Sequence, residues 1–155
     1  MPEVNYKDRA VTPKLELCVS TKMENLTVIG DFVASVAKEF GLDDDVTFAM
    51  QMAVDEACAN VMEHACCGKS NEMVRLTCQI LDDDLVVTIH DHGRAFDPQA
   101  VPRPDITAPL EKREEGALGL YLMEKLMDSV EFQFDAVQGN TLTMKKRIHR
   151  GKQAL

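Results

Sequence analysis

The chain has 155 residues, of which 45% are hydrophobic and 28% charged, a composition typical of one globular domain rather than a disordered or multidomain chain. Its 17 Lys and Arg residues against 26 Asp and Glu residues give a net charge of -9, which disfavours nucleic acid as a partner because phosphates are bound by cations. No window approaches the roughly 18 apolar residues of a membrane-spanning helix, so no membrane association is expected.

The cysteines and the N-terminal residues predict a cytoplasmic protein. Five Cys residues are an odd number and contain no C-x-x-C pair, so neither a disulfide framework nor a paired zinc knuckle is indicated. Reduced thiols are typical of the cytoplasm, and residues 1–9 contain no apolar segment like that of a signal peptide. We expect an N-terminal extension over 1–13, one domain over 14–148 and a basic tail over 149–155.

The first half of the domain predicts one strand and two helices. Alternating apolar residues over 14–19 indicate a half-buried strand. Over 24–40 the apolar residues recur at spacings of three and four, and Gly41 then supplies a helix stop. Acidic residues at 43–45 suit the first turn of a second helix, which we expect to run to about residue 65.

The second half predicts two hairpins, a long loop and a third helix. Apolar runs over 73–81 and 85–91 form the first hairpin. Residues 92–115 contain four prolines and no apolar period, and we interpret them as a functional lid. A helix over 116–127 precedes a hairpin of strands 130–134 and 140–148. This order predicts an α+β two-layer sandwich, with helices on one face of a mixed, mostly antiparallel sheet.

Polar residues cluster in the second helix and after the strand that ends at 91. Glu56, Asn60 and His64 recur at every fourth position, where an amide oxygen suits Mg²⁺ beside phosphates and a carboxylate can accept a hydroxyl proton. Asp91 can accept a hydrogen bond from an amino group, and Gly93 lets a flat ligand approach the backbone. Each motif by itself is better explained as a solvated helix face or an ordinary turn.

The order of the motifs is more specific than any one of them. E-x-x-x-N on a helix, D-x-G after a strand, a proline-bearing lid, G-x-x-G at a helix start and a late G-x-T together resemble the nucleotide-binding boxes of the GHKL ATPases. Within that superfamily, the segments GLYLMEKLMD at 119–128 and GNTL at 139–142 are similar to the anti-sigma factor serine kinases of the RsbW-like type. The resemblance covers about residues 14–148 and implies the Bergerat-type ATP-binding fold.

The resemblance implies roles for the residues of the helix and strand motifs. Asn60 matches the asparagine that ligates Mg²⁺, and Glu56 matches the glutamate that acts as a base. Asp91 matches the acid that holds the adenine amino group, directly or through water together with Thr141. Gly93 matches the glycine beneath the adenine ring.

The resemblance also implies how the ATP phosphates are held. Gly116 and Gly119, with Leu118 between them, match the segment whose backbone amides meet phosphates at the start of a helix. Cationic help would come from side chains near by, and Lys112 and Arg113 in the lid, together with Arg94, are the candidates.

The function implied by the resemblance is an Mg-ATP-dependent protein serine/threonine kinase that is also an anti-sigma factor. Its expected partners are a sigma factor and a STAS-domain anti-anti-sigma protein, whose Ser or Thr it phosphorylates. The oligomeric state stays open between a monomer and a homodimer, although members of the family are often dimers. Ala95 and Ala117 stand where family members commonly carry glycines, which leaves a non-catalytic ATP-binding regulator as an alternative. A detached histidine-kinase-type catalytic domain is a further alternative.

Overall fold

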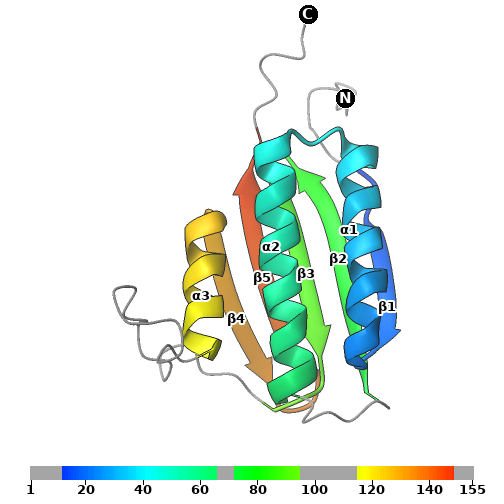
Figure 1. The fold of residues 1–155 in the computed structure, drawn as a ribbon, viewed down its shortest axis with the longest axis vertical. Coiled ribbons are helices and arrows are strands. Elements are labelled where there is room, and N and C mark those ends of the chain that lie inside the picture. Colours follow the sequence, from blue (N-terminus) through cyan, green and yellow to red (C-terminus); the bar gives the residue numbers. More distant parts are fainter. Residues whose placement is uncertain (1–11, 66–71, 95–114, 149–155) are drawn as a thin grey trace, which may run out of the picture.

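A five-stranded antiparallel sheet with the strand order β1-β2-β3-β5-β4 carries helices on one face, as Figure 1 shows. The computed structural model describes residues 12–65, 72–94 and 115–148. In chain order the described elements are β1 (Leu15–Ser20), η1 (Met23–Asn25), α1 (Leu26–Phe40), α2 (Asp44–Asn60), η2 (Val61–Ala65), β2 (Met73–Leu81), β3 (Asp84–Asp91), α3 (Glu115–Leu126), β4 (Ser129–Asp135) and β5 (Gly139–Arg147).

The helix boundaries follow from capping residues. Gly41 has a φ of 63°, the left-handed conformation that glycine adopts without strain, and its N–H donates to the carbonyl groups of Ala37 and Lys38 at the end of α1. The carboxylate of Asp43 accepts a hydrogen bond of 2.8 Å from the N–H of Val46 at the start of α2. Both boundaries confirm the sequence prediction.

The core lies between the sheet and the helices. Every second residue of β2 and β3 is buried beneath the helices, which is the expected consequence of the alternation of side chains along a strand. On β3 this buried row continues from Ile89 to Asp91, so a carboxylate ends a row of otherwise apolar residues. The other members of the row are Leu85 and Val87.

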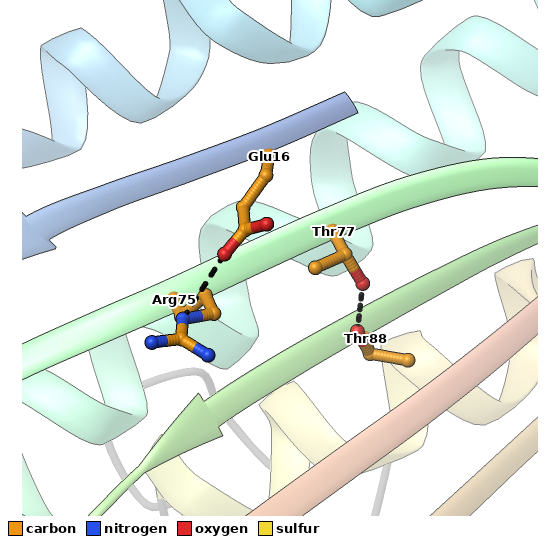
Figure 2. Close-up of polar contacts among 4 residues, drawn as sticks. All are labelled: Glu16, Arg75, Thr77 and Thr88. Atoms are coloured by element: carbon orange, nitrogen blue, oxygen red, sulfur yellow. Dashed lines mark hydrogen bonds and ion pairs between the residues drawn. The ribbon is translucent and has the colours of Figure 1, made fainter. Parts of the chain in front are cut away.

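The opposite face of the sheet carries polar side chains. Figure 2 shows Glu16 and Arg75 forming an ion pair between β1 and β2, with 3.1 Å between Oε1 and Nε. On the same face Thr77 of β2 and Thr88 of β3 are joined by a hydrogen bond between their hydroxyl groups. No described helix covers this face (Figure 1), so the residues that matter for a site between sheet and helices are those of the buried row.

The structure confirms the α+β sandwich and refines several details. All four pairings among the described strands are antiparallel, so the expected mixed component of the sheet is absent from them. The second helix is α-helical only to Asn60, and residues 61–65 form a π-helical turn. Most of the expected lid, residues 95–114, lies outside the described residues.

Two further observations concern the limits of the domain. Thr12, which we expected to belong to the N-terminal extension, donates from its N–H to the carbonyl of Ile80 and accepts from the Ile80 N–H through its hydroxyl oxygen. The tail expected over 149–155 lies outside the described residues. None of the helices described is both long and apolar enough to span a membrane.

Candidate functional site

Asp91 is a buried carboxylate held in a fixed position at the end of β3. Asp91 is only 4% exposed. A buried carboxylate needs hydrogen-bond donors. Oδ1 accepts two hydrogen bonds, from the N–H of Gly93 at 2.7 Å and from Nδ2 of Asn140 at 3.0 Å. Both of these hydrogen bonds go to Oδ1, and no described residue donates to Oδ2.

Asn140 holds the turn that follows Asp91. Besides Asp91, its Nδ2 donates to the carbonyl oxygens of Gly93 at 3.0 Å and Arg94 at 3.1 Å. One side-chain amide therefore ties the end of β3 and the next three residues to the start of β5. Asn140 belongs to the GNTL segment, whose sequence alone does not indicate this role.

The strand register separates Thr141 from Asp91. Asp91 pairs with Asn140, whereas Thr141 pairs with His90. Because side chains alternate between the two faces of a sheet, Thr141 lies on the polar face with His90, and Asn140 lies on the face of Asp91. The expectation that Thr141 helps Asp91 to hold adenine is therefore corrected, and Asn140 occupies the position beside the carboxylate.

A glycine is required where β5 begins next to Asp91. Gly139 has a φ of 96°, and a Cβ at this position would collide with the carbonyl oxygen of Asp91. On the polar face, Nε2 of His90 lies 2.5 Å from the carbonyl oxygen of Gln138, in the turn before β5. The β4–β5 turn is thus closely joined to the end of β3.

Glu56 and Asn60 lie one turn apart near the end of α2, and both are half-buried. They face Gly119 of α3, because a Cβ at residue 119 would lie 2.8 Å from Oε2 of Glu56 and 3.6 Å from Nδ2 of Asn60. The absence of a side chain at Gly119 leaves the space that the carboxylate and the amide occupy. The structure therefore brings together three of the predicted site residues, from two helices.

The environment of Glu56 favours its protonated form. Burial raises the pKa of Glu56 above its usual value, and the negative charges of Asp55 and Glu63 raise it further. A carboxylate whose pKa is shifted upward binds a proton more strongly than an ordinary Glu. This shift suits a group that receives a hydroxyl proton.

Cys58 lies between Glu56 and Asn60 in the sequence of α2, and the charge of Asp91 on β3 influences its thiol. It is buried on α2, two residues after Glu56 and two before Asn60. Burial raises the pKa of the Cys58 thiol above its usual range, and the charges of Asp55, Cys78 and Asp91 add to this effect. Asp91 is thus one of the charged groups that influence Cys58. Figure 1 shows the end of β3, the last turn of α2 and the start of α3 at the same end of the molecule.

The glycines at the start of α3 have different positions relative to its free amides. The first N–H groups of a helix have no intrahelical acceptor. Gly116 is the second residue of α3 and belongs to this first turn, whereas Gly119 is the fifth residue and lies beyond it. Of these two glycines, Gly116 therefore has an N–H group without an intrahelical acceptor, whereas Gly119 makes room for Glu56.

The remaining predicted residues are placed as follows. Gly93 lies in the turn beside Asp91, with its N–H already bonded to the carboxylate. Leu118 and Ala117 lie in the first turns of α3. Lys112, Arg113 and Ala95 lie outside the described residues.

The arrangement combines a buried acceptor, a carboxylate with an amide, and a helix start at one end of the molecule. The buried acceptor, Asp91, suits a hydrogen-bond donor on a planar base. The amide of Asn60 beside the carboxylate of Glu56 suits a metal-bound phosphate. The backbone amides at the start of α3 suit phosphate oxygens. In the described part of the chain no three His, Cys, Asp or Glu residues are grouped as a metal site.

Comparison with known proteins identifies the family. A family model described as a histidine kinase-like ATPase domain matches residues 19–146. The serine-protein kinase RsbW of Bacillus cereus is 33% identical over 141 residues, which cover 88% of this chain and 86% of that protein. The RsbW protein of Bacillus thuringiensis gives the same values. The chain belongs to the histidine kinase-like ATPase family, among its RsbW-like members. The resemblance inferred from the motifs is thereby confirmed.

A solved structure of the RsbU and RsbW domains of a Mycobacterium tuberculosis protein has the same fold. The TM-score is 0.63 at 18% sequence identity, and the match covers 90% of this chain. The chain spans 33% of the length of the solved chain, which contains both domains. The chain belongs to a family of ATPase domains. ATP is therefore the nucleotide to consider at Asp91, Glu56 and Asn60.

Proposed function

We propose that the chain is an ATP-dependent protein serine/threonine kinase and anti-sigma factor that works by partner switching. The observation that carries the proposal is the position of Gly119 facing Glu56 and Asn60 near the end of α2, at the end of the molecule where β3 also ends with the buried Asp91. The similarity to proteins named serine-protein kinase RsbW, over 88% of the chain, supports the same activity.

Asp91 gives the site a preference for adenine in this proposal. Its Oδ2 accepts a hydrogen bond from the exocyclic amino group of the base, while Oδ1 stays bonded to Gly93 and Asn140. Guanine presents an acceptor at the equivalent position, which would leave two acceptors facing each other at a buried site. ATP and ADP are therefore expected to bind in preference to GTP.

Asn60 is the proposed protein ligand of Mg²⁺. Its amide oxygen is a neutral ligand that Mg²⁺ accepts together with phosphate oxygens and water. The side chain lies beside Glu56 and Gly119, close to the first turn of α3, where Gly116 and Leu118 offer backbone amides to the phosphates. Lys112 and Arg113 precede this turn in the sequence and are proposed to neutralise phosphate charge. Bound Mg-ATP supplies the transferable γ-phosphoryl group.

Glu56 is the proposed base for the transfer. The hydroxyl oxygen of the substrate Ser or Thr forms a bond to the γ-phosphorus, the bond from that phosphorus to the bridging oxygen of ADP breaks, and Glu56 accepts the hydroxyl proton. The upward shift of its pKa makes Glu56 a better proton acceptor than a fully solvated carboxylate. The products are a phosphorylated protein and ADP.

The proposed partners are a sigma factor and a STAS-domain anti-anti-sigma protein. The net charge of -9 favours a basic docking surface on the sigma factor, because opposite charges accelerate association. Phosphorylation of the STAS protein adds negative charge and is expected to release it from this acidic chain. A sigma factor as partner would place the protein in the cytoplasm, and a homodimer is part of the same proposal.

Nucleotide binding is tested first by calorimetry with Mg-ATP, Mg-ADP and Mg-GTP. The proposal predicts binding of both adenine nucleotides, weaker binding of GTP, and a loss of this preference in Asp91→Asn. Equal affinity for ATP and GTP in the wild type would contradict the assignment of Asp91. An affinity pull-down in Mg-ATP and in Mg-ADP then tests the partners, and recovery of neither a sigma factor nor a STAS protein would favour a binding-only regulator.

A further inference from the structure

Phe134 is an exposed aromatic residue on the face of the sheet that carries Asp91. Along β4 the side chains of Val130 and Phe132 pack against the core beneath the helices. Phe134 follows in the same alternation and therefore points to the same face, yet it is 57% exposed. A large apolar ring at this position is not explained by core packing.

The strand register places Phe134 in one row with Asn140 and Asp91, where the base of the nucleotide is proposed to bind. Phe134 of β4 pairs with Asn140 of β5, and Asn140 pairs with Asp91 of β3. Neighbouring strands are about 4.8 Å apart, so the row from Asp91 to Phe134 spans two spacings, about 10 Å. A planar base bonded to Asp91 and extending along this row would lie over Asn140 and come within reach of the Phe134 ring.

The backbone that carries Phe134 is fixed by the next turn. The carboxylate of Asp135 accepts hydrogen bonds from the N–H of Val137 at 2.8 Å and of Gln138 at 2.7 Å. These backbone hydrogen bonds lower the pKa of Asp135, so its ionised form stabilises the turn at neutral pH. At the other end of the turn, Gly139 lies against the carbonyl of Asp91. The ring therefore projects from a hairpin whose turn is closed by hydrogen bonds and lies against the end of β3 at Asp91.

Resting on the proposed function, we propose that Phe134 binds the adenine ring of the nucleotide. The amino group of the base is held by Asp91, and the π face or edge of the base contacts the Phe134 ring. Aromatic contact with a base is independent of the hydrogen-bonding pattern. Phe134 accordingly contributes affinity for the purine, whereas Asp91 contributes the preference for adenine over guanine.

Truncation of the ring provides the first test. Phe134→Ala is expected to weaken ATP and ADP binding by roughly tenfold each, because the contact is to the base and not to the phosphates. Phe134→Tyr keeps the ring and should bind within about twofold of the wild type. Val137→Ala is the matched control, since Val137 lies in the same hairpin but is 87% exposed at its tip. An unchanged affinity in Phe134→Ala overturns the inference.

A fluorescent reporter provides a second test that does not depend on loss of affinity. The chain contains no Trp, so Phe134→Trp and Val137→Trp each introduce a single indole. Saturating ATP should quench or shift the emission of Phe134→Trp and leave that of Val137→Trp unchanged. Calorimetry on the wild type runs in parallel: ATP binding without any response at residue 134 overturns this inference alone. An absence of ATP binding to the wild type overturns the proposed function, and this inference with it.

Discussion

The position of Gly119 against Glu56 determines where the candidate catalytic carboxylate lies. A Cβ at residue 119 would be 2.8 Å from Oε2 of Glu56, which is closer than such atoms approach in stable structures. The atom in the way belongs to the end of a flexible side chain and not to the backbone. A side chain at residue 119 would therefore move the carboxylate without breaking the packing of α3 on α2.

This relationship predicts the effect of Gly119→Ala. The variant should fold, because the added methyl group displaces only the Glu56 side chain, and ATP binding should change by less than about threefold. Phosphoryl transfer should fall by about tenfold or more, since a displaced base loses its alignment with the substrate hydroxyl. Single-turnover phosphorylation and calorimetry measure the two effects separately.

Gly30→Ala is the matched control for this substitution. Gly30 lies in α1, and a Cβ there would meet nothing within 4 Å. Replacement by Ala should stabilise the helix by roughly 0.5–1 kcal/mol and leave phosphorylation unchanged. If Gly119→Ala phosphorylates as fast as Gly30→Ala, catalysis does not need the space that Gly119 leaves for Glu56.

Substitutions of Asn140 and Thr141 should affect ATP affinity differently, although the two residues are adjacent. Asn140→Ala removes a hydrogen bond to the buried carboxylate of Asp91 and two bonds to the following turn, so ATP affinity should drop by about tenfold. Thr141→Ala alters the polar face of the sheet and should leave ATP affinity within about twofold. Calorimetry on the two variants decides between them, and a larger loss in Thr141→Ala would contradict the strand register.

Asn60→Ala should remove the dependence of ATP binding on Mg²⁺. The amide oxygen is the proposed protein ligand of the ion, so the variant should bind ATP with similar affinity in Mg²⁺ and in EDTA. The wild type should bind more tightly in Mg²⁺ than in EDTA. A variant that keeps the full effect of Mg²⁺ would show that the ion is held by other groups.

The raised pKa of Glu56 predicts a dependence of folding stability on pH. Since the folded state favours the protonated carboxyl group, ionised Glu56 opposes folding increasingly as the pH rises through its shifted pKa. Glu56→Gln should therefore have a higher melting temperature than the wild type at pH 7.5. The difference should shrink as the pH falls below the ordinary pKa of Glu, about 4.3.

Thermal unfolding across this pH range measures the effect. Glu39→Gln serves as the control because Glu39 is an exposed residue of α1. A melting temperature for Glu56→Gln that is equal to or below that of the wild type at pH 7.5 would contradict the raised pKa.

Much of the fold could be predicted because its signals are local. The stop of α1 at Gly41 and the start of α2 at Asp43 depend on residues within one turn of each boundary. The first hairpin follows from alternation and a short acidic turn. The π-helical turn after Asn60 could not be predicted, because the apolar pattern that indicates a helix does not distinguish its hydrogen-bond spacing.

The candidate site could be predicted only in part, since two of its features depend on pairing between distant segments. Glu56 and Asn60 share a helix face that the sequence spacing reveals. Whether Asn140 or Thr141 faces Asp91 depends on the β3–β5 register, which a shift of one residue would reverse. The purpose of Gly119 likewise appears only when α3 is packed on α2.

Transfer of phosphate from ATP to a STAS-domain protein tests the central claim most directly. The wild type, Glu56→Gln and Glu39→Gln are incubated with Mg-ATP and candidate STAS proteins, and mass spectrometry then detects phosphoserine or phosphothreonine. We predict phosphorylation by the wild type and by Glu39→Gln, and a rate at least about 100-fold lower for Glu56→Gln with ATP binding retained. Phosphorylation by Glu56→Gln at the wild-type rate, or none by a wild type that binds ATP, would contradict the account.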